Sequence, residues 1–342
     1  MSPELLTDTS RTMRALVLHG KEDLRFERRD VLRPGQGEVR VEIGSVGVCG
    51  SDKHFYLEGR ASSDIVTDPL VLGHEFGGRI VEVGPGGDEA RVGQRVSVEP
   101  LMADPLSPQA RRGSYNLDPG QRFFGVPGTD GALQQYLNVP AENAFAIPDS
   151  VSDDAAAMVE TISVSLNGVR KAGVSAGSRI LITGGGPIGL FAAQLAFLQG
   201  ASRVVLVEPQ SERRAKAASF GCEVSADLAS VDELFDAVIE CTGVGIVRHD
   251  SCLKVAPGGR AIFIGVGAQD ASIPMPAIIE REVSVQGVMR YAFTWPTVID
   301  AVASGRIDAD SLVSRTLPFD RAIEAWTVPL ATEVKTMIHV NR

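Results

Sequence analysis

The stretch from Ile180 to Leu198, ILITGGGPIGLFAAQLAFL, carries no charge over nearly the length that a membrane-spanning helix needs. Three successive glycines and Pro187 interrupt it directly after a β-branched segment. Glycines at such a place favour a tight turn, and a proline favours the first turn of a helix. The stretch therefore predicts a short buried strand, a turn and a helix that begins near Pro187, and not a membrane span.

Apolar strand-like segments alternate with helix-like segments from about Ser178 to Met289. The strand-like segments read RILITG, RVVLVEP, DAVIECTG, GRAIFIGVG and REVSVQGV, and two helix-like segments read FAAQLAFLQG and AKAASFG. This alternation is typical of βαβ units, which build a parallel sheet covered by helices. We therefore predict an α/β domain with a doubly wound parallel sheet.

The chain before this region has a different pattern. From about Met13 to Val139, short β-type runs such as RALVLHG, EVRVEI and QRVSVEP are bounded by glycine and proline. Such runs are typical of a barrel-like antiparallel domain. The C-terminal segment lacks a further βαβ unit and is expected to pack on the first domain, and the first dozen residues are expected to form a loose tail. We place the domains at 1–155, 156–294 and 295–342.

The net charge and the cysteine content narrow the functional class. The formal net charge is −10 and no block of like charges occurs, which argues against a nucleic-acid or anionic-membrane partner. The four cysteines have no regular spacing, and no charged-then-apolar leader opens the chain. We expect a cytoplasmic protein that acts on a small molecule.

The glycines of the uncharged stretch match a dinucleotide-binding pattern. Gly184, Gly186 and Gly189 form G-x-G-x-x-G between the predicted strand and helix, and Glu208 ends the next strand. The helix N-terminus would face a pyrophosphate with its unpaired N–H groups. Glu208 would accept hydrogen bonds from ribose hydroxyls and repel a 2′-phosphate, which favours NAD over NADP, although Arg213 and its neighbour weigh against this preference. The alternative is a glycine-rich turn that binds nothing.

Two short stretches carry possible metal ligands. VCGSDKH ends at His54, and LVLGHEFGGRIVEVG runs from Leu70 to Gly84. Taken alone, they would hold a buried structural cysteine and a hydrogen-bonded histidine. Taken together, they offer a thiolate, an imidazole and a carboxylate, which are the ligands of a catalytic zinc with one open position.

The motifs CGSD, GHE, FFGVPGTDGALQQY, GGGPIG, ECTG and GVMRYAFTWP together resemble the zinc-dependent medium-chain alcohol dehydrogenases, and within them the sorbitol (polyol) dehydrogenase branch. The resemblance covers nearly the whole chain. It implies a GroES-like β-rich catalytic domain interrupted by a Rossmann domain, in a homodimer or homotetramer. The reaction it implies is hydride transfer from a secondary alcohol of a sorbitol-like polyol to NAD.

The resemblance also implies one catalytic zinc per chain, held by Cys49 and His74. Glu75 ranks first as the third ligand, and Glu160 is the alternative, either bound directly or through the metal's water. Because neighbours on a regular strand point to opposite faces, His74 and Glu75 can share one ion only if the backbone is irregular, which the flanking glycines permit.

Further roles follow from the same resemblance. Ser51 and His54 would begin a proton relay to water, Asp52 would orient the metal-binding histidine by a hydrogen bond, and Lys53 is expected to be solvated. Arg290 would lie near the substrate hydroxyls and the nicotinamide, with Tyr291 beside it. An interdomain salt bridge is the alternative for this arginine.

The predicted cofactor contacts lie in the glycine loop, after the following strand and at the ends of later strands. Plain core packing is the alternative for Ile188 and for Ile264 to Val266. The contacts are Gly184, Gly186, Pro187, Ile188, Gly189, Glu208, Arg213, Ile264, Gly265, Val266, Val288, Met289 and Arg290.

Two features depart from this family. Phe55 stands where a tyrosine is common in the sorbitol enzymes, which leaves the substrate open. The lobe from Glu99 to Gly120 lacks the four cysteines that hold a structural zinc in many relatives, and Asp118 stands where the last would be. We expect prolines and inward packing of Tyr115 and Leu117 to hold the lobe.

Two alternative functions remain at this point. The first is a relative that acts on another secondary alcohol, such as an amino alcohol, an inositol or an aldose, because the zinc and NAD sites would be shared. The second is a catalytically silent NAD-binding protein, against which the intact set of possible zinc ligands argues.

Overall fold

The computed structural model describes residues 7–267, 270–328 and 332–341, which divide into two compact units. The first unit is built from the described residues of Met1–Glu160, Trp295–Ala303 and Asp308–Arg342. The second unit consists of Thr161–Thr294 and Ser304–Ile307, without the undescribed pair at 268–269. Helix α3 (Asp153–Ala172) contains the junction between residues 160 and 161.

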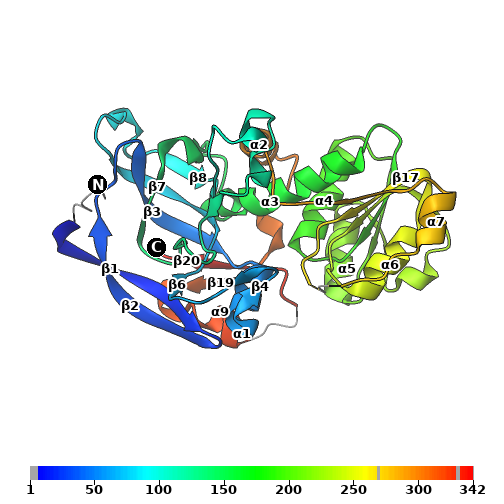
Figure 1. The fold of residues 1–342 in the computed structure, drawn as a ribbon, viewed down its shortest axis with the longest axis horizontal. Coiled ribbons are helices and arrows are strands. Elements are labelled where there is room, and N and C mark those ends of the chain that lie inside the picture. The colour runs from blue at the N-terminus through cyan, green and yellow to red at the C-terminus, as the bar shows by residue number, and fades with distance from the viewer. Residues whose placement is uncertain (1–6, 268–269, 329–331, 342) are drawn as a thin grey trace. The chain divides into compact units, whose positions relative to one another are not determined.

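The first unit is mainly antiparallel (Figure 1). Its seven-stranded sheet has the order β12-β8-β7-β3-β20-β19, with β11 also paired to β3. These strands are β3 (Glu38–Gly47), β7 (Glu75–Val83), β8 (Arg95–Val98), β11 (Tyr136–Pro140), β12 (Ala144–Ala146), β19 (Val313–Pro318) and β20 (Lys335–His339). The C-terminal strands thereby join the sheet of the N-terminal segment.

Smaller sheets complete this unit. A three-stranded sheet has the order β2-β1-β6, and β4 pairs with β5 and β9 with β10. Their bounds are β1 (Thr7–Gly20), β2 (Asp23–Leu32), β4 (Arg60–Ala61), β5 (Asp64–Ile65), β6 (Leu70–Val71), β9 (Leu101–Met102) and β10 (Arg122–Phe123). Because β1 begins at Thr7, the expected loose tail is wrong from that residue on; residues 1–6 lie outside the described part.

The alternating pattern of EVRVEI explains why β3 lies in the core. Val39, Val41 and Ile43 are at most 2% exposed and pack in one hydrophobic cluster with residues of β1, β7 and β8. Apart from the first part of α3, the helices of the unit are short: α1 (Gly50–Glu58), α2 (Pro108–Arg111), α8 (Trp295–Ala303) and α9 (Glu324–Thr327). Single 3-10 turns lie at Glu89–Arg91, Tyr115–Leu117, Ala141–Asn143, Asp310–Leu312 and Phe319–Arg321.

The second unit contains the predicted parallel sheet, with the strand order β15-β14-β13-β16-β17-β18. The strands are β13 (Arg179–Thr183), β14 (Arg203–Val207), β15 (Glu223–Ser225), β16 (Phe235–Glu240), β17 (Val255–Phe263) and β18 (Ser284–Gly287). The helices are α4 (Pro187–Leu198), α5 (Ser211–Ser219), α6 (Gly245–Leu253) and α7 (Met275–Glu280), with a 3-10 turn at Leu228–Ser230. Helix α4 begins at Pro187 as predicted, because proline's missing N–H costs nothing at a first helical position.

None of the helices in the described residues is long and apolar enough to cross a membrane. The uncharged stretch from Ile180 to Leu198 is divided between β13, the glycine turn and α4, as its punctuation predicts.

Candidate metal centre and cofactor loop

Cys49, His74 and Glu75 meet in the first unit, with one ligand atom of each lying within 4.8 Å of the others. Cys49 precedes α1, and Glu75 is the first residue of β7. His74 stands just before that strand, after Gly73, whose φ of +93° belongs to the left-handed region. Because His74 lies outside the regular strand, the alternation of strand side chains does not separate it from Glu75.

Negative charge surrounds His74. Asp52 is 1% exposed, and its Oδ2 accepts a hydrogen bond of 3.0 Å from the N–H of Cys49. Its Oδ1 lies 3.6 Å from Nδ1 of His74, which is an ion-pair distance and longer than the expected hydrogen bond. Burial alone would lower the pKa of His74, but Asp52, Cys49 and Glu160 outweigh it and raise that pKa to about 10. The same concentration of negative charge would attract a divalent cation.

Glu160 is buried on α3 but lies outside the three-residue cluster. Its charge nevertheless contributes to the raised pKa of His74. A thiolate, an imidazole and a carboxylate in one cluster suit zinc, because all three are its preferred donor types. The residues present therefore fit the metal.

Lys335 on β20 forms an ion pair with Glu75, and both side chains are at most 2% exposed. Burial alone would lower the pKa of Lys335, but the charges of Glu75 and Cys49 raise it, so the ammonium is retained. Sequence reasoning missed this residue. A lone lysine in the apolar segment VKTMIHV was the available signal, since a lysine inside a buried strand needs a charged partner.

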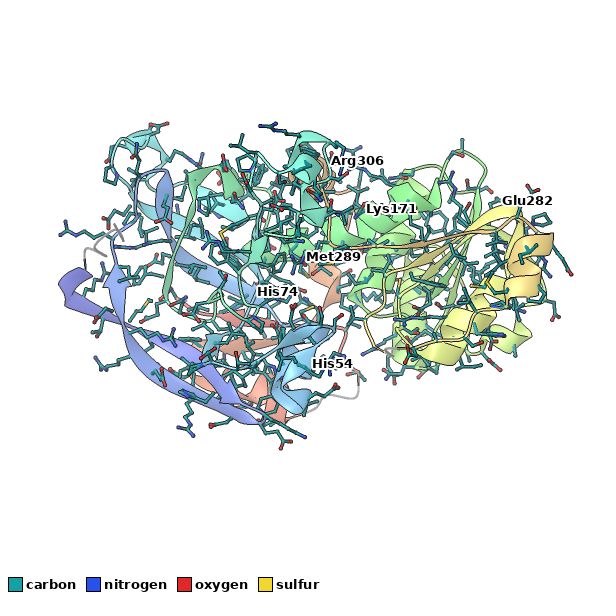
Figure 2. All side chains as sticks on the ribbon, in the orientation of Figure 1. His54, His74, Lys171, Glu282, Met289 and Arg306 are labelled. Atoms are coloured by element: carbon teal, nitrogen blue, oxygen red, sulfur yellow. The ribbon has the colours of Figure 1, made fainter. Side chains whose placement is uncertain are left out.

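The residues of the predicted proton relay lie on α1. Ser51 is half-buried in its first turn, and Nδ1 of His54 lies 2.8 Å from Oε1 of Glu58, one turn further on. Figure 2 labels His54 on this helix and His74 among the strands. Lys53 is not simply solvated as expected, because its Nζ donates a hydrogen bond of 2.6 Å to Oε1 of Glu333.

In the second unit, the glycine loop has the geometry that dinucleotide binding requires. Gly184 has a φ of +98°, and a Cβ on Gly189 would overlap the carbonyl oxygen of Gly184. Gly186 precedes α4, and a Cβ built there meets nothing within 4 Å. The loop therefore leaves open space at the start of α4, where a pyrophosphate would bind.

Glu208 is held beside this loop by two backbone hydrogen bonds. Its Oε2 accepts from the N–H of Gly185 at 2.7 Å, and its Oε1 accepts from the N–H of Gln210 at 2.9 Å. A carboxylate can accept further bonds on its remaining lone pairs. Arg214 donates to the carbonyl oxygen of Glu208 at 2.8 Å, while Arg213 is half-buried on α5.

The other predicted cofactor contacts lie at strand ends and on α4 of the same unit. Ile264 is buried, and Val266 and Met289 are exposed. The carbonyl of Ile188 accepts a hydrogen bond of 3.0 Å from a serine of α3. The N–H of Val288 bonds the carbonyl of β17's last residue at 2.9 Å. These positions are compatible with cofactor contacts, which stay a prediction.

Arg290 and Tyr291 follow β18 in the second unit. Arg290 has a φ of +48°, and its carbonyl accepts a hydrogen bond of 2.8 Å from Nδ2 of Asn167. Tyr291 is fully buried. Because the metal cluster belongs to the other unit, the roles of these two residues toward a substrate stay predictions.

The cysteine-free lobe is held by carboxylates. Asp118 accepts hydrogen bonds from the N–H groups of Asp104 at 2.8 Å and Gly120 at 3.0 Å. Tyr115 donates a hydrogen bond of 2.6 Å to Glu99, so it contributes by a polar contact. Leu117 is 53% exposed, and its expected inward packing is wrong because the 3-10 turn from Tyr115 directs it to solvent.

Comparisons with known proteins agree with this architecture. The family model described as the alcohol dehydrogenase GroES-like domain matches residues 35–149, and the one described as zinc-binding dehydrogenase matches residues 187–304. A sorbitol dehydrogenase of Gallus gallus is 35% identical over 95% of this chain and 95% of its own.

Two solved structures are similar over almost their whole length. A protein assigned as a zinc-binding dehydrogenase from Sinorhizobium meliloti, bound to NADP, is 31% identical with a TM-score of 0.90, covering 97% of this chain and 100% of that one. The 2R,3R-butanediol dehydrogenase from Bacillus subtilis is 30% identical with a TM-score of 0.88, covering 96% and 100%.

The fold, the three-residue metal cluster and the similarity to known dehydrogenases together define the class of this protein. It is a zinc-containing oxidoreductase with a GroES-like domain and a Rossmann domain. The chain belongs to the zinc-dependent medium-chain alcohol dehydrogenase family. The predicted fold class, the enzymatic activity and the use of zinc are thereby confirmed.

Proposed function

We propose that this protein oxidises a secondary alcohol of a small polyol and transfers the hydride to NAD. The observation that carries the proposal is the cluster of half-buried Cys49 with buried His74 and Glu75, which offers zinc three protein ligands. The open glycine loop before α4, with Glu208 beside it, supports a nicotinamide dinucleotide as the hydride acceptor.

Zinc bound to the cluster would supply Lewis-acid chemistry that lowers the pKa of an alcohol. The chain's own residues would do the rest. Cys49, His74 and Glu75 hold the ion, and buried Asp52 fixes the backbone N–H of Cys49. Ser51 and His54 would receive the hydroxyl proton and pass it along α1 toward water, since His54 is partly exposed beside Glu58.

Similarity to a sorbitol dehydrogenase over nearly the whole chain supports a polyol as substrate. A short diol is the second candidate, because a butanediol dehydrogenase is also similar. Phe55 is 1% exposed and offers no hydroxyl, so it cannot donate a hydrogen bond to a substrate. We expect this difference to change the preferred polyol, because a lost hydrogen-bonding partner discriminates strongly among substrates.

The decisive experiment follows NADH formation with pentitols, hexitols, inositols, amino alcohols and short diols. A pentitol or hexitol with the highest kcat/KM supports the proposal, and a short diol or an inositol at the top supports a relative of different specificity. Zinc-loaded protein that binds NADH but oxidises none of these alcohols would instead support a silent cofactor-binding protein.

We also propose a cytoplasmic location and a homo-oligomeric state. Light scattering of the purified protein tests the oligomeric state.

A further inference from the structure

The ion pair between Lys335 and Glu75 places a second cation on a carboxylate of the metal cluster. Lys335 Nζ contacts Oε2 of Glu75, and it also donates a hydrogen bond of 3.2 Å to the carbonyl of Val48, the residue before Cys49. The ammonium thus contacts one cluster residue, Glu75, directly, and it contacts the backbone next to a second one, Cys49. With both side chains of the pair at most 2% exposed, solvent screens this charge little.

Strand pairing brings these residues together from distant parts of the chain. Gly47 on β3 pairs with Glu75 on β7 and with Met337 on β20, two residues after Lys335. A Cβ on Gly47 would lie 2.9 Å from Cε of Lys335 and closer still to Oε2 of Glu75. The missing side chain at Gly47 therefore leaves the room that the ion pair occupies.

We propose that Lys335 is a positioning residue that keeps one oxygen of Glu75 away from the metal and weakens the hold of the site on zinc. The inference rests on the proposed zinc site. Because Oε2 contacts the ammonium, zinc and Lys335 would share the carboxylate of Glu75. Two cations that share one buried carboxylate repel each other, so Lys335 reduces the charge that Glu75 donates to zinc.

A purely structural ion pair makes the opposite prediction. If Lys335 only held Glu75 in place, its removal would misplace a ligand and weaken zinc binding. If Lys335 competes with the metal for Glu75, its removal frees the second oxygen and strengthens zinc binding. The sign of the change in zinc affinity therefore distinguishes the two roles.

The experiment measures the release of zinc from the holoenzyme into excess chromophoric chelator, which does not require the metal-free variant to fold. Lys335→Met is expected to release zinc at least tenfold more slowly than the wild type. Lys335→Arg, which keeps the charge, is expected to stay within about threefold of it. Cobalt-substituted Lys335→Met should show a changed visible spectrum, since a second carboxylate oxygen would raise the coordination number.

Matched variants distinguish a failure of the inference about Lys335 from a failure of the proposed zinc site. Lys53→Met removes a lysine whose side chain is 39% exposed and pairs with Glu333, and it should leave zinc release unchanged. In a Glu75→Gln background, Lys335→Met should lose its effect, because the proposed coupling runs through that carboxylate. Release at the wild-type rate or faster in Lys335→Met overturns the inference. Retention of zinc by Cys49→Ser would instead overturn the zinc site itself.

Discussion

The guanidinium of Arg248 on α6 lies 3.5 Å from the fully buried carboxylate of Glu240, the last residue of β16. Oε1 of Glu240 accepts hydrogen bonds from Thr242 and from the N–H of Gly243 at 2.9 Å. Arg248 also donates a hydrogen bond of 2.7 Å to the carbonyl of Gly265. Arg248 and Glu240 thereby connect the loop after β16 to the loop after β17, which contains the predicted cofactor contacts Ile264 to Val266.

Glu240→Gln should weaken NADH binding by about tenfold, because loss of a charged hydrogen-bonding acceptor loosens both loops. Fluorescence titration with NADH measures the effect. Glu233→Gln is the matched control: Glu233 pairs with Arg179 and Arg203 at the first residues of β13 and β14, and its loss should leave NADH affinity unchanged. Equal affinity in Glu240→Gln and wild type would refute the role of the pair.

Glu99 makes stability depend on pH. Burial raises its pKa to about 7 from 4.5, against the opposing hydrogen bond from Tyr115. Between these pH values the folded protein binds more protons than the unfolded chain, so stability falls as pH rises through this window, by about 3 kcal/mol at most. Glu99→Gln should remove this loss and be more stable than wild type at pH 8, with little difference near pH 4.5.

Denaturant midpoints of both proteins across this pH range test the assignment. Tyr115→Phe removes the hydrogen bond that lowers the pKa of Glu99, so its stability should decline up to a higher pH than that of wild type. Parallel curves for wild type and Glu99→Gln would show that Glu99 does not titrate in this window.

Purified protein should contain one zinc per chain. Metal analysis should give a ratio near one in the wild type and near zero in Cys49→Ser, while NADH affinity persists in the variant because the glycine loop belongs to the second unit. Asp118→Asn should keep the ratio and lower stability by about 1 kcal/mol, since its carboxylate bonds two backbone N–H groups. A second zinc that survives Cys49→Ser would reveal a metal site in the lobe.

Cofactor preference should depend on Glu208. The wild type is expected to favour NAD, and Glu208→Ala should reduce the ratio of kcat/KM for NAD over NADP at least tenfold by removing repulsion of the 2′-phosphate. Arg213→Ala should instead raise the ratio of kcat/KM for NAD over that for NADP. A wild type that reduces NADP as well as NAD would contradict the prediction. The test matters because the similar dehydrogenase from Sinorhizobium meliloti was solved with NADP bound.

Local patterns in the sequence determined the elements and much of the candidate site. Pro187 marked the first residue of α4, and the alternation in EVRVEI marked β3, because both depend on residues close together in the chain. The family's short motifs brought Cys49, His74 and Glu75 into consideration for the same reason. Their adjacency in space was an implication of the resemblance, and the irregular backbone at Gly73 provides its physical basis.

Tertiary structure alone decided which distant charges meet. Lys335 reaches Glu75 only because β20 and β7 both pair with β3, and Lys53 reaches Glu333 across a similar separation in the chain. Leu117 is exposed although its apolar side chain favours burial, because the turn that contains it directs it outward. Sequence periodicity reports the environment along one element, whereas a buried ion pair depends on strand pairing between elements far apart in the chain.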